Sequence, residues 1–257
     1  MAKHNLPVSV NLLLLVGLII ASFFVNAFNA EIFLRLNALH SNLSDLFWIS
    51  MTTLGDGLLL GIILGMFILV NPRITVFGLA MLIGASISVN LIKVIIPVLR
   101  PAEALGTIHF LGPVLRSGSF PSGHSAAAFA TSLALAHFSP SRMFKFILLF
   151  FGSLIGLSRI FVGAHFPNDV LWGIILSLLV YELLVVWVWP KIECYVPETP
   201  PFENRFFQAL VSVQIVMSLF CLVIYSWYFA EYPPAAIAIS SGVLTFFMAA
   251  VLKSFKN

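Results

Sequence analysis

Charged residues are scarce in this chain: Asp, Glu, Lys and Arg together make up 9% of 257 residues. Hydrophobic residues reach 60% and the mean hydropathy is +1.06, values that a water-soluble globule could not bury in one core. The formal net charge of +3 is spread along short connections and not gathered into a basic face, so nothing supports nucleic-acid binding. The composition predicts an integral membrane protein whose surroundings are the lipid bilayer.

The sequence also has few cysteines and no cluster of acidic residues. The two cysteines, Cys194 and Cys221, have neither metal-ligand spacing nor a paired framework, and we interpret both as structural. No acidic cluster is present to hold Mg²⁺, so neither a metal ion nor a cofactor is expected. The first apolar run is long for a signal peptide, and Phe24, Asn26 and Phe28 make a poor cleavage site, so we expect a retained first span.

Long apolar runs are what the sequence has instead. A bilayer core about 30 Å thick needs roughly 20 apolar residues in a helix that rises about 1.5 Å per residue. Eight candidate stretches lie near 8–28, 55–70, 74–96, 123–139, 143–162, 168–189, 209–229 and 234–252. Gly55, Asp56 and Gly57 interrupt the second stretch, where Asp56 is expected to cap a helix. Residues 41–54 could form a separate helix that lies at the membrane interface, so the number of spans within residues 41–70 is left undecided.

The expected fold class is therefore all-α: a polytopic transmembrane helical bundle of about eight spans. We expect a six-span catalytic core over 1–190, a cytoplasmic loop over 191–208, and two additional C-terminal spans over 209–257. With the N-terminus inside, eight of the 13 Lys and Arg residues lie at cytoplasmic ends: Lys3, Arg73, Arg142, Lys145, Lys191, Arg205, Lys253 and Lys256. The positive-inside rule favours this orientation.

Three polar segments at the ends of apolar runs carry cations or imidazoles. They are K-x6-R-P at Lys93, Arg100 and Pro101; P-S-G-H at 121–124; and S-R-x5-H-x3-D at Ser158, Arg159, His165 and Asp169. Charge within a membrane is costly, so these side chains are expected to have a function. In the predicted orientation all three segments reach the extracytoplasmic side. Together they resemble the phosphatidic-acid phosphatase type 2 (PAP2) superfamily of membrane phosphatases, over about 77 residues of this chain.

The cations suit a phosphate group. Breaking a phosphate ester needs positive groups on the non-bridging oxygens, an in-line nucleophile and a proton donor for the leaving oxygen. Arg100 and Arg159 can offer planar forks to phosphate oxygens, and Lys93 adds a compact third charge.

The P-S-G-H segment predicts an anion seat at the start of a helix. Pro121 suits the first helical turn, where backbone N–H groups are free. The Ser122 hydroxyl and the close backbone approach at Gly123 add to that seat, and His124 projects from the same turn. The small residues 125–128 that follow would let neighbouring helices pack closely beneath the site.

His165 and Asp169 are four residues apart, near a helix start at Pro167, so the carboxylate can reach one imidazole nitrogen and leave the other free. The PAP2 resemblance implies that His165 is the nucleophile and forms a phosphohistidine, which water then hydrolyses. It also implies that Asp169 orients His165 and that His124 protonates the leaving oxygen.

The expected activity is hydrolysis of a lipid phosphate or diphosphate at the outer face of a membrane, with the bacterial inner (cytoplasmic) membrane as the expected location. Isoprenyl diphosphate, phosphatidic acid, phosphatidylglycerophosphate and lipid A phosphate are all open as substrates, and the sequence indicates no oligomeric state. One alternative is a phosphotransferase that passes the phosphoryl group to a second lipid. Another is a transporter or lipid-binding protein, which needs no nucleophile. Vanadate-dependent haloperoxidases share the constellation but resemble soluble proteins, whereas this chain spans a membrane.

Overall fold

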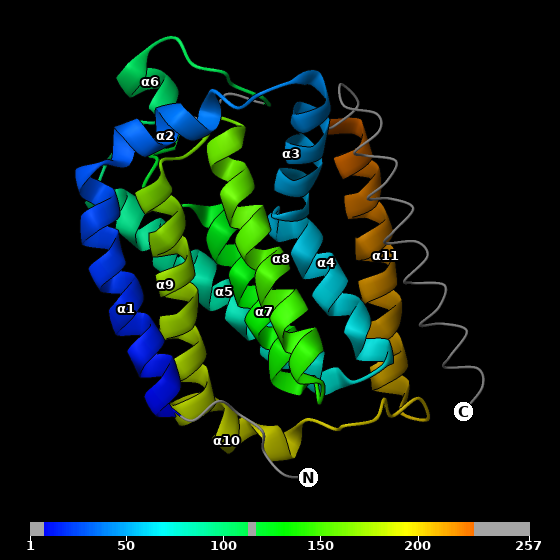
Figure 1. Cartoon of the computed structure of the whole chain (residues 1–257). Helices are drawn as coiled ribbons and strands as arrows, with labels where there is room; N and C mark the ends of the chain where they lie inside the picture. Colours follow the sequence, from blue (N-terminus) through cyan, green and yellow to red (C-terminus); the bar gives the residue numbers. More distant parts are fainter. Residues whose placement is uncertain (1–7, 113–116, 229–257) are drawn as a thin grey trace.

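The computed structural model describes residues 8–112 and 117–228, and every regular element in those two ranges is helical (Figure 1). The helices are α1 (Val8–Ala27), α2 (Asn29–Asn37), α3 (Asn42–Leu54), α4 (Gly57–Met66), α5 (Pro72–Ile95), α6 (Pro101–Leu105), α7 (Gly123–Phe138), α8 (Arg142–Phe161), α9 (Pro167–Leu183), α10 (Trp189–Ile192) and α11 (Arg205–Tyr228). Short turns η1 (Phe67–Leu69), η2 (Leu184–Val188) and η3 (Glu193–Tyr195) extend three of them. The predicted last span, 234–252, lies outside the described residues.

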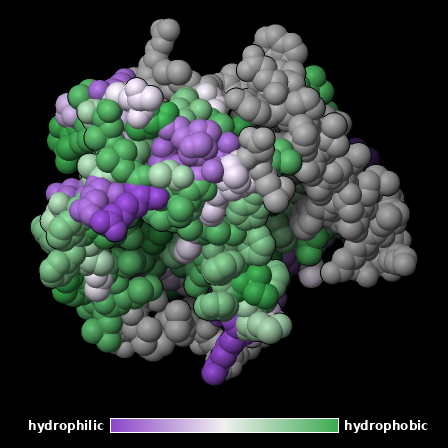
Figure 2. Space-filling model, turned by 45° about the horizontal axis from the view of Figure 1, so that its top comes forward, coloured by the Kyte–Doolittle hydropathy of each residue, from purple (hydrophilic) through white to green (hydrophobic). Residues whose placement is uncertain are grey.

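The flanks of the bundle are apolar. Large hydrophobic side chains are exposed along several helices, among them Phe23 (72%), Val94 (83%) and Phe146 (70%). Figure 2 shows hydrophobic flanks below an end of the bundle on which hydrophilic side chains gather in patches. Exposed apolar surface of this extent is stable in lipid and not in water, so the chain is an integral membrane protein.

Three helical segments of the described chain are long and apolar enough to cross a membrane: 72–95, 142–161 and 167–195. Two bent helix pairs raise this number to five if each pair is one span. The first pair is α1 with α2, bent by 80°, and the second is α3 with α4, bent by 59°. The described residues thus hold three to five candidate spans, and a total of eight stays a prediction.

The second predicted span, 55–70, corresponds to α4 and η1, which form the second part of the bent pair that begins with α3. Asp56 caps α4 as predicted, because its Oδ1 accepts hydrogen bonds from the amides of Leu58 (2.9 Å) and Leu59 (3.3 Å). Residues 41–54 do form a separate helix, α3, with Ser41 as its cap. However, α3 runs alongside the upper part of α8 and does not lie across the helix ends, which is the position of α2 (Figure 1).

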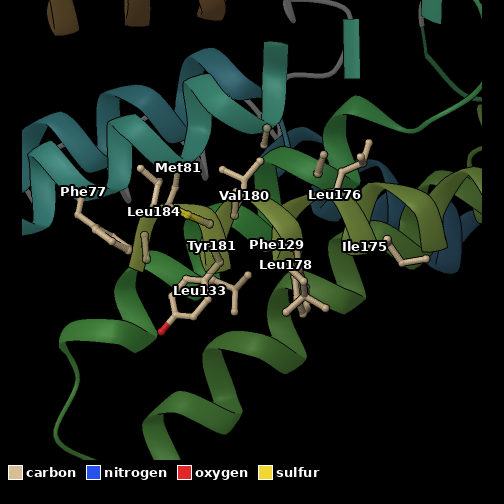
Figure 3. Packing of buried hydrophobic residues seen from close by; sticks show 14 of the residues in the cluster. Phe77, Met81, Phe129, Leu133, Ile175, Leu176, Leu178, Val180, Tyr181 and Leu184 are labelled. Atoms are coloured by element: carbon tan, nitrogen blue, oxygen red, sulfur yellow. The ribbon is translucent and has the colours of Figure 1, made fainter. Parts of the chain in front are cut away.

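The core lies where α5, α7 and α9 meet. Figure 3 shows Phe77 and Met81 of α5 packed towards Tyr181 of α9 and Leu184 of η2, with Phe129 of α7 in the same cluster. The small residues 125–128 of α7 are buried, as predicted, and they allow close helix contacts. At Gly173 of α9 an added Cβ would lie 2.7 Å from the Ser122 carbonyl oxygen, so glycine is required for α9 to approach the start of α7.

Basic residues mark the end of the bundle opposite the three polar segments. Arg73 lies at the start of α5, Arg142 at the start of α8, Lys191 in α10 and Arg205 at the start of α11. Arg73 Nε donates to the Val196 carbonyl (2.9 Å), and its Nη1 pairs with Glu198. These contacts fasten the connection between η3 and α11 to the bundle.

Candidate active site

The three polar segments meet at one end of the bundle. The C-terminal ends of α5 and α8 and the N-terminal ends of α7 and α9 all point to that end (Figure 1). The side chains brought there are largely hidden from solvent: exposure is 6% for Arg100, 5% for Arg159, and 2% for both His165 and Asp169. Buried charge of this density requires mutual pairing or a bound ligand of opposite sign.

His165 and Asp169 lie side by side, as the spacing predicts. His165 Nδ1 is 3.4 Å from Asp169 Oδ2. The same carboxylate oxygen accepts hydrogen bonds from the Phe166 amide (3.0 Å) and the Ser119 hydroxyl (2.5 Å). Ser119 Oγ is also 3.4 Å from His165 Nδ1. The carboxylate is therefore held rigidly beside one imidazole nitrogen, and a proton on that nitrogen faces negative charge.

Sequence reasoning missed Ser119. It precedes the P-S-G-H segment in a Ser- and Gly-containing connection, 46 residues from His165 and 50 from Asp169. Nothing in the local pattern distinguishes it from an ordinary loop serine. Its role depends on the fold of the connection between α6 and α7.

The second nitrogen of His165 faces a cation. Nε2 lies 3.3 Å from Arg100 Nη1. Burial lowers the pKa of His165 well below its ordinary value, and the cations of Arg159, Arg100 and Lys93 lower it further. The imidazole is therefore neutral at pH 7. With the proton on the Asp169 side, the lone pair of Nε2 points towards the arginine, where a phosphate would be bound.

Arg100 also organises two connecting segments. Its Nε donates to the Ser117 carbonyl (2.8 Å), and Nη1 donates to the Ala164 carbonyl (2.9 Å). Burial lowers its pKa, but a guanidinium keeps its charge at neutral pH. Lys93 acts in the same region, since its Nζ donates to the carbonyl oxygens of Gly118 and Ser119 (3.3 Å to the latter). Both predicted phosphate-binding residues thus fix the segment that carries Ser119.

Arg159 has a buried N–H group that is not used in any hydrogen bond to the described residues. Its Nη1 donates to the Thr52 hydroxyl of α3, while its buried Nε has no hydrogen-bond partner among the described residues. An unsatisfied buried donor is costly, and an anion in the pocket would satisfy it. Thr52, which sequence reasoning missed, is 107 positions from Arg159.

The P-S-G-H segment opens α7, which begins at Gly123, the first residue of the predicted stretch 123–139. Ser122 is the N-cap, and its Oγ accepts from the Ser125 amide (3.3 Å) and the Ser125 hydroxyl (2.8 Å). Pro121 therefore precedes the cap and is not in the first turn, because the Ser122 side chain already satisfies an amide of that turn. The amides of Gly123 and His124 donate to none of the described residues, so they remain available to an anion.

His124 is half-buried beside the break between α3 and α4. A Cβ added at Gly55 would lie 2.5 Å from Ile155 Cγ2 and 3.4 Å from His124 Cβ, so glycine lets this break pack against α8 with His124 in contact beside it. Arg159 and His165 lie close enough to interact with His124 electrostatically. Its ring makes no hydrogen bond to the described residues, which leaves both nitrogens for a substrate or water.

A sequence profile described as the PAP2 superfamily matches residues 74–193, a range that contains all three polar segments. The chain therefore contains a PAP2 superfamily region, which takes up a little less than half of its length. Two curated members align with its central part. Undecaprenyl-diphosphatase BcrC of Bacillus subtilis (strain 168) is 39% identical over 74 residues, which are 29% of this chain and 37% of that protein. Phosphatidylglycerophosphatase B of the same organism is 36% identical over 77 residues, 26% of this chain and 38% of that protein. These alignments span less than half the length of either relative.

Two solved PAP2 structures share the fold over a longer range. The crystal structure of LpxE from Aquifex aeolicus has a TM-score of 0.58 and 29% identity, covering 62% of this chain and 96% of that one. The transmembrane PAP2-type phosphatidylglycerolphosphate phosphatase from Bacillus subtilis has a TM-score of 0.54 and 28% identity, covering 72% and 95%. Nearly the whole fold of each is therefore present here, and this chain has further residues beyond it.

Proposed function

We propose that this PAP2 protein is an integral membrane phosphatase that hydrolyses a lipid phosphate or diphosphate through a phosphohistidine intermediate. The observation that carries the proposal is the setting of His165: a neutral, buried imidazole with a carboxylate beside Nδ1 and a guanidinium beside Nε2. That arrangement fits a nucleophile aimed at a bound anion. The relatives whose names state a phosphatase activity support the same reaction class.

In the proposed first step Nε2 of His165 attacks phosphorus and the bond from phosphorus to the leaving oxygen breaks. Asp169 stabilises the positive imidazole that results, and Ser119 holds Asp169 in place. Arg159 and the free amides at the start of α7 bind the non-bridging oxygens. Arg100, Lys93, Ser122 and Gly123 belong to the same proposed phosphate site.

His124 is proposed as the acid and base of the cycle. His124 must be protonated when the substrate is bound, which the negative phosphate beside it favours, and in the first step it donates that proton to the leaving oxygen and becomes neutral. In the second step the neutral His124 accepts a proton from water as the water oxygen attacks phosphorus and the nitrogen–phosphorus bond breaks. Phosphate is released and His165 regains its lone pair.

We further propose that the site faces the extracytoplasmic side of a bacterial inner membrane. Arg73, Arg142, Lys191 and Arg205 lie at the end of the bundle opposite the site, which supports this orientation by the positive-inside rule. The proposed architecture has a six-span core over 1–190, a cytoplasmic connection over 191–208 and two further spans over 209–257, eight in total.

The proposed substrates are the classes that fit a tetrahedral anion on a lipid: isoprenyl diphosphate, phosphatidic acid, phosphatidylglycerophosphate and lipid A phosphate. A panel of these four, incubated with purified protein in detergent and a chelator, tests the reaction by the release of inorganic phosphate. We expect release from at least one lipid, and a strong preference would name the substrate.

The same assay separates the alternatives when a second lipid is added. Transfer of label to that lipid without free phosphate would identify a phosphotransferase. Folded protein that binds lipid phosphates but turns over none of them, with or without an acceptor, would identify a transporter or binding protein and would contradict the proposal.

A further inference from the structure

A second cluster of ligand-bearing side chains lies outside the phosphate pocket. His40 is in the connection between α2 and α3, Asp45 is in the first turn of α3, and His109 is in the connection between α6 and α7. One ligand atom from each residue lies within 4.8 Å of those of the other two. His40 and Asp45 fall outside the range matched by the PAP2 profile, and none of the three belongs to the polar segments.

His109 has an unsatisfied nitrogen. Its Nε2 lies 3.0 Å from Asp45 Oδ2, yet this buried atom has no hydrogen bond of acceptable geometry to any described residue. The His40 ring stacks on the His109 ring, with centroids 4.0 Å apart and planes inclined by 10°. The nitrogen and the carboxylate oxygen form an ion pair only when His109 is protonated; with a neutral imidazole they are two adjacent ligand atoms that a cation can bind.

We propose that His40, Asp45 and His109 bind one Zn²⁺ ion, with water as the fourth ligand. Two imidazoles and one carboxylate form a donor set that suits zinc, whereas Mg²⁺ and Ca²⁺ favour sites made of oxygen. Tetrahedral ligands about 2.1 Å from zinc lie about 3.4 Å from one another, so the cluster has to contract when the ion binds. The exposed His40 ring is free to tilt out of the stack and turn a nitrogen to the ion.

The bound ion would link the α2–α3 connection to the segment around His109. That segment contacts the catalytic loop, the connection between α8 and α9 that carries His165. Asn37 donates to the carbonyl oxygens of His109 (2.8 Å) and Phe161 (3.2 Å), and the His109 amide donates back to Asn37 Oδ1 (3.0 Å). The Leu111 amide donates to the Val162 carbonyl (3.0 Å). Residues 161 and 162 lie between Arg159, in the last turn of α8, and His165, so the zinc site would stabilise the connection between α8 and α9 that carries His165. Its role would be structural, outside the phosphate chemistry.

The test uses the full chain, purified without a polyhistidine tag and stripped with a chelator that is then removed. Zinc is added, unbound ion is removed by gel filtration, and the metal content and thermal unfolding are measured. We expect one Zn²⁺ per chain and a Tm that rises by several degrees with saturating zinc, because the ion binds the folded state. Mg²⁺ at the same concentration should have neither effect.

Two ligand variants and one control identify the site. His40→Ala removes an exposed side chain and Asp45→Asn removes only a charge, so both should keep the Tm of the stripped wild type while zinc affinity falls at least tenfold. Glu31→Gln, an exposed carboxylate of α2 paired with Arg35, should bind zinc like the wild type. Absence of zinc uptake by the wild type, or uptake unchanged in both ligand variants, would overturn the proposal. Metal content and Tm do not depend on phosphatase activity, so these measurements test the zinc site independently of the proposed function.

Discussion

The identity of the buried carboxylate at Asp169 decides which nitrogen of His165 can react. The carboxylate accepts from Ser119 and Phe166 and can only accept from His165, which keeps the proton on Nδ1. An amide at this position could present an N–H to Nδ1 and stabilise the opposite tautomer, with the proton on Nε2. The nucleophilic lone pair would then point away from the phosphate.

We therefore expect Asp169→Asn to lower kcat by roughly 10²- to 10⁴-fold while substrate binding changes little. Steady-state kinetics and direct binding of the lipid to the variant measure the two effects separately. Glu31→Gln, with its exposed carboxylate, is the matched control and should keep wild-type kcat. Equal losses of turnover and binding would indicate that Asp169 supports the fold and not the tautomer.

The pKa of His165 predicts the acid limb of the pH profile. Burial and neighbouring cations lower that pKa, so the neutral nucleophile persists as the pH falls through about 6.5, the ordinary value for histidine. The half-maximal point of kcat/KM on the acid side should lie below that pH. Profiles measured with a lipid monophosphate and a lipid diphosphate should share this limb, because it belongs to the enzyme. A limb at or above pH 6.5 with both substrates would contradict the electrostatic account.

At the scale of secondary-structure elements, helix positions were predictable and helix directions were not. Apolar run length and punctuation such as Asn71-Pro72 and Ser141 predicted α5 and α8 to within two residues. The bends of 80° after α1 and 59° after α3 depend on contacts between distant segments, for example Thr52 with Arg159. For the same reason the sequence predicted that the three segments would share one face, but not that Lys93 and Arg100 would hold the Ser119 segment.

Gly163, in the connection between α8 and α9, occupies a position where a side chain is poorly tolerated. Its φ is +77°, and an added Cβ would lie 2.4 Å from the His109 carbonyl oxygen. We expect Gly163→Ala to destabilise the protein by about 1–3 kcal/mol and to lower turnover, since the strain falls on the loop that carries His165. Thermal unfolding in detergent and phosphate release measure the two losses.

Gly57→Ala is the control for that substitution. Gly57 opens α4, and an added Cβ there meets no atom within 4 Å, so stability should stay the same or rise slightly. If Gly163→Ala were as stable and active as Gly57→Ala, residues 108–110 could not pack closely on the loop that carries His165, contrary to the structure.

For the whole molecule, orientation in the membrane is the property that the arrangement of charge predicts. The basic ends of α5, α8 and α11 lie opposite the site, and the exposed, unpaired Cys194 lies in η3 between the basic α10 and the start of α11. Cys194 is therefore expected in the cytoplasm.

A membrane-impermeant maleimide tests this orientation in a Cys221→Ser background, where Cys194 is the remaining cysteine. It should label Cys194 in inverted vesicles and leave it unlabelled in intact spheroplasts. Cys194→Ser in the same background controls for labelling of other groups. Labelling in spheroplasts and not in inverted vesicles would reverse the orientation and place the phosphate site in the cytoplasm.

In the proposed reaction His165 carries the phosphoryl group during turnover. Rapid acid-free quenching of the enzyme with a ³²P-labelled lipid phosphate, followed by peptide mapping under alkaline conditions that preserve phosphohistidine, tests it directly. We expect an acid-labile label on the peptide that contains His165 and no label on a folded His165→Ala protein, which should have lost hydrolysis. Label on another residue, or hydrolysis by His165→Ala at more than a few per cent of the wild-type rate, would contradict it.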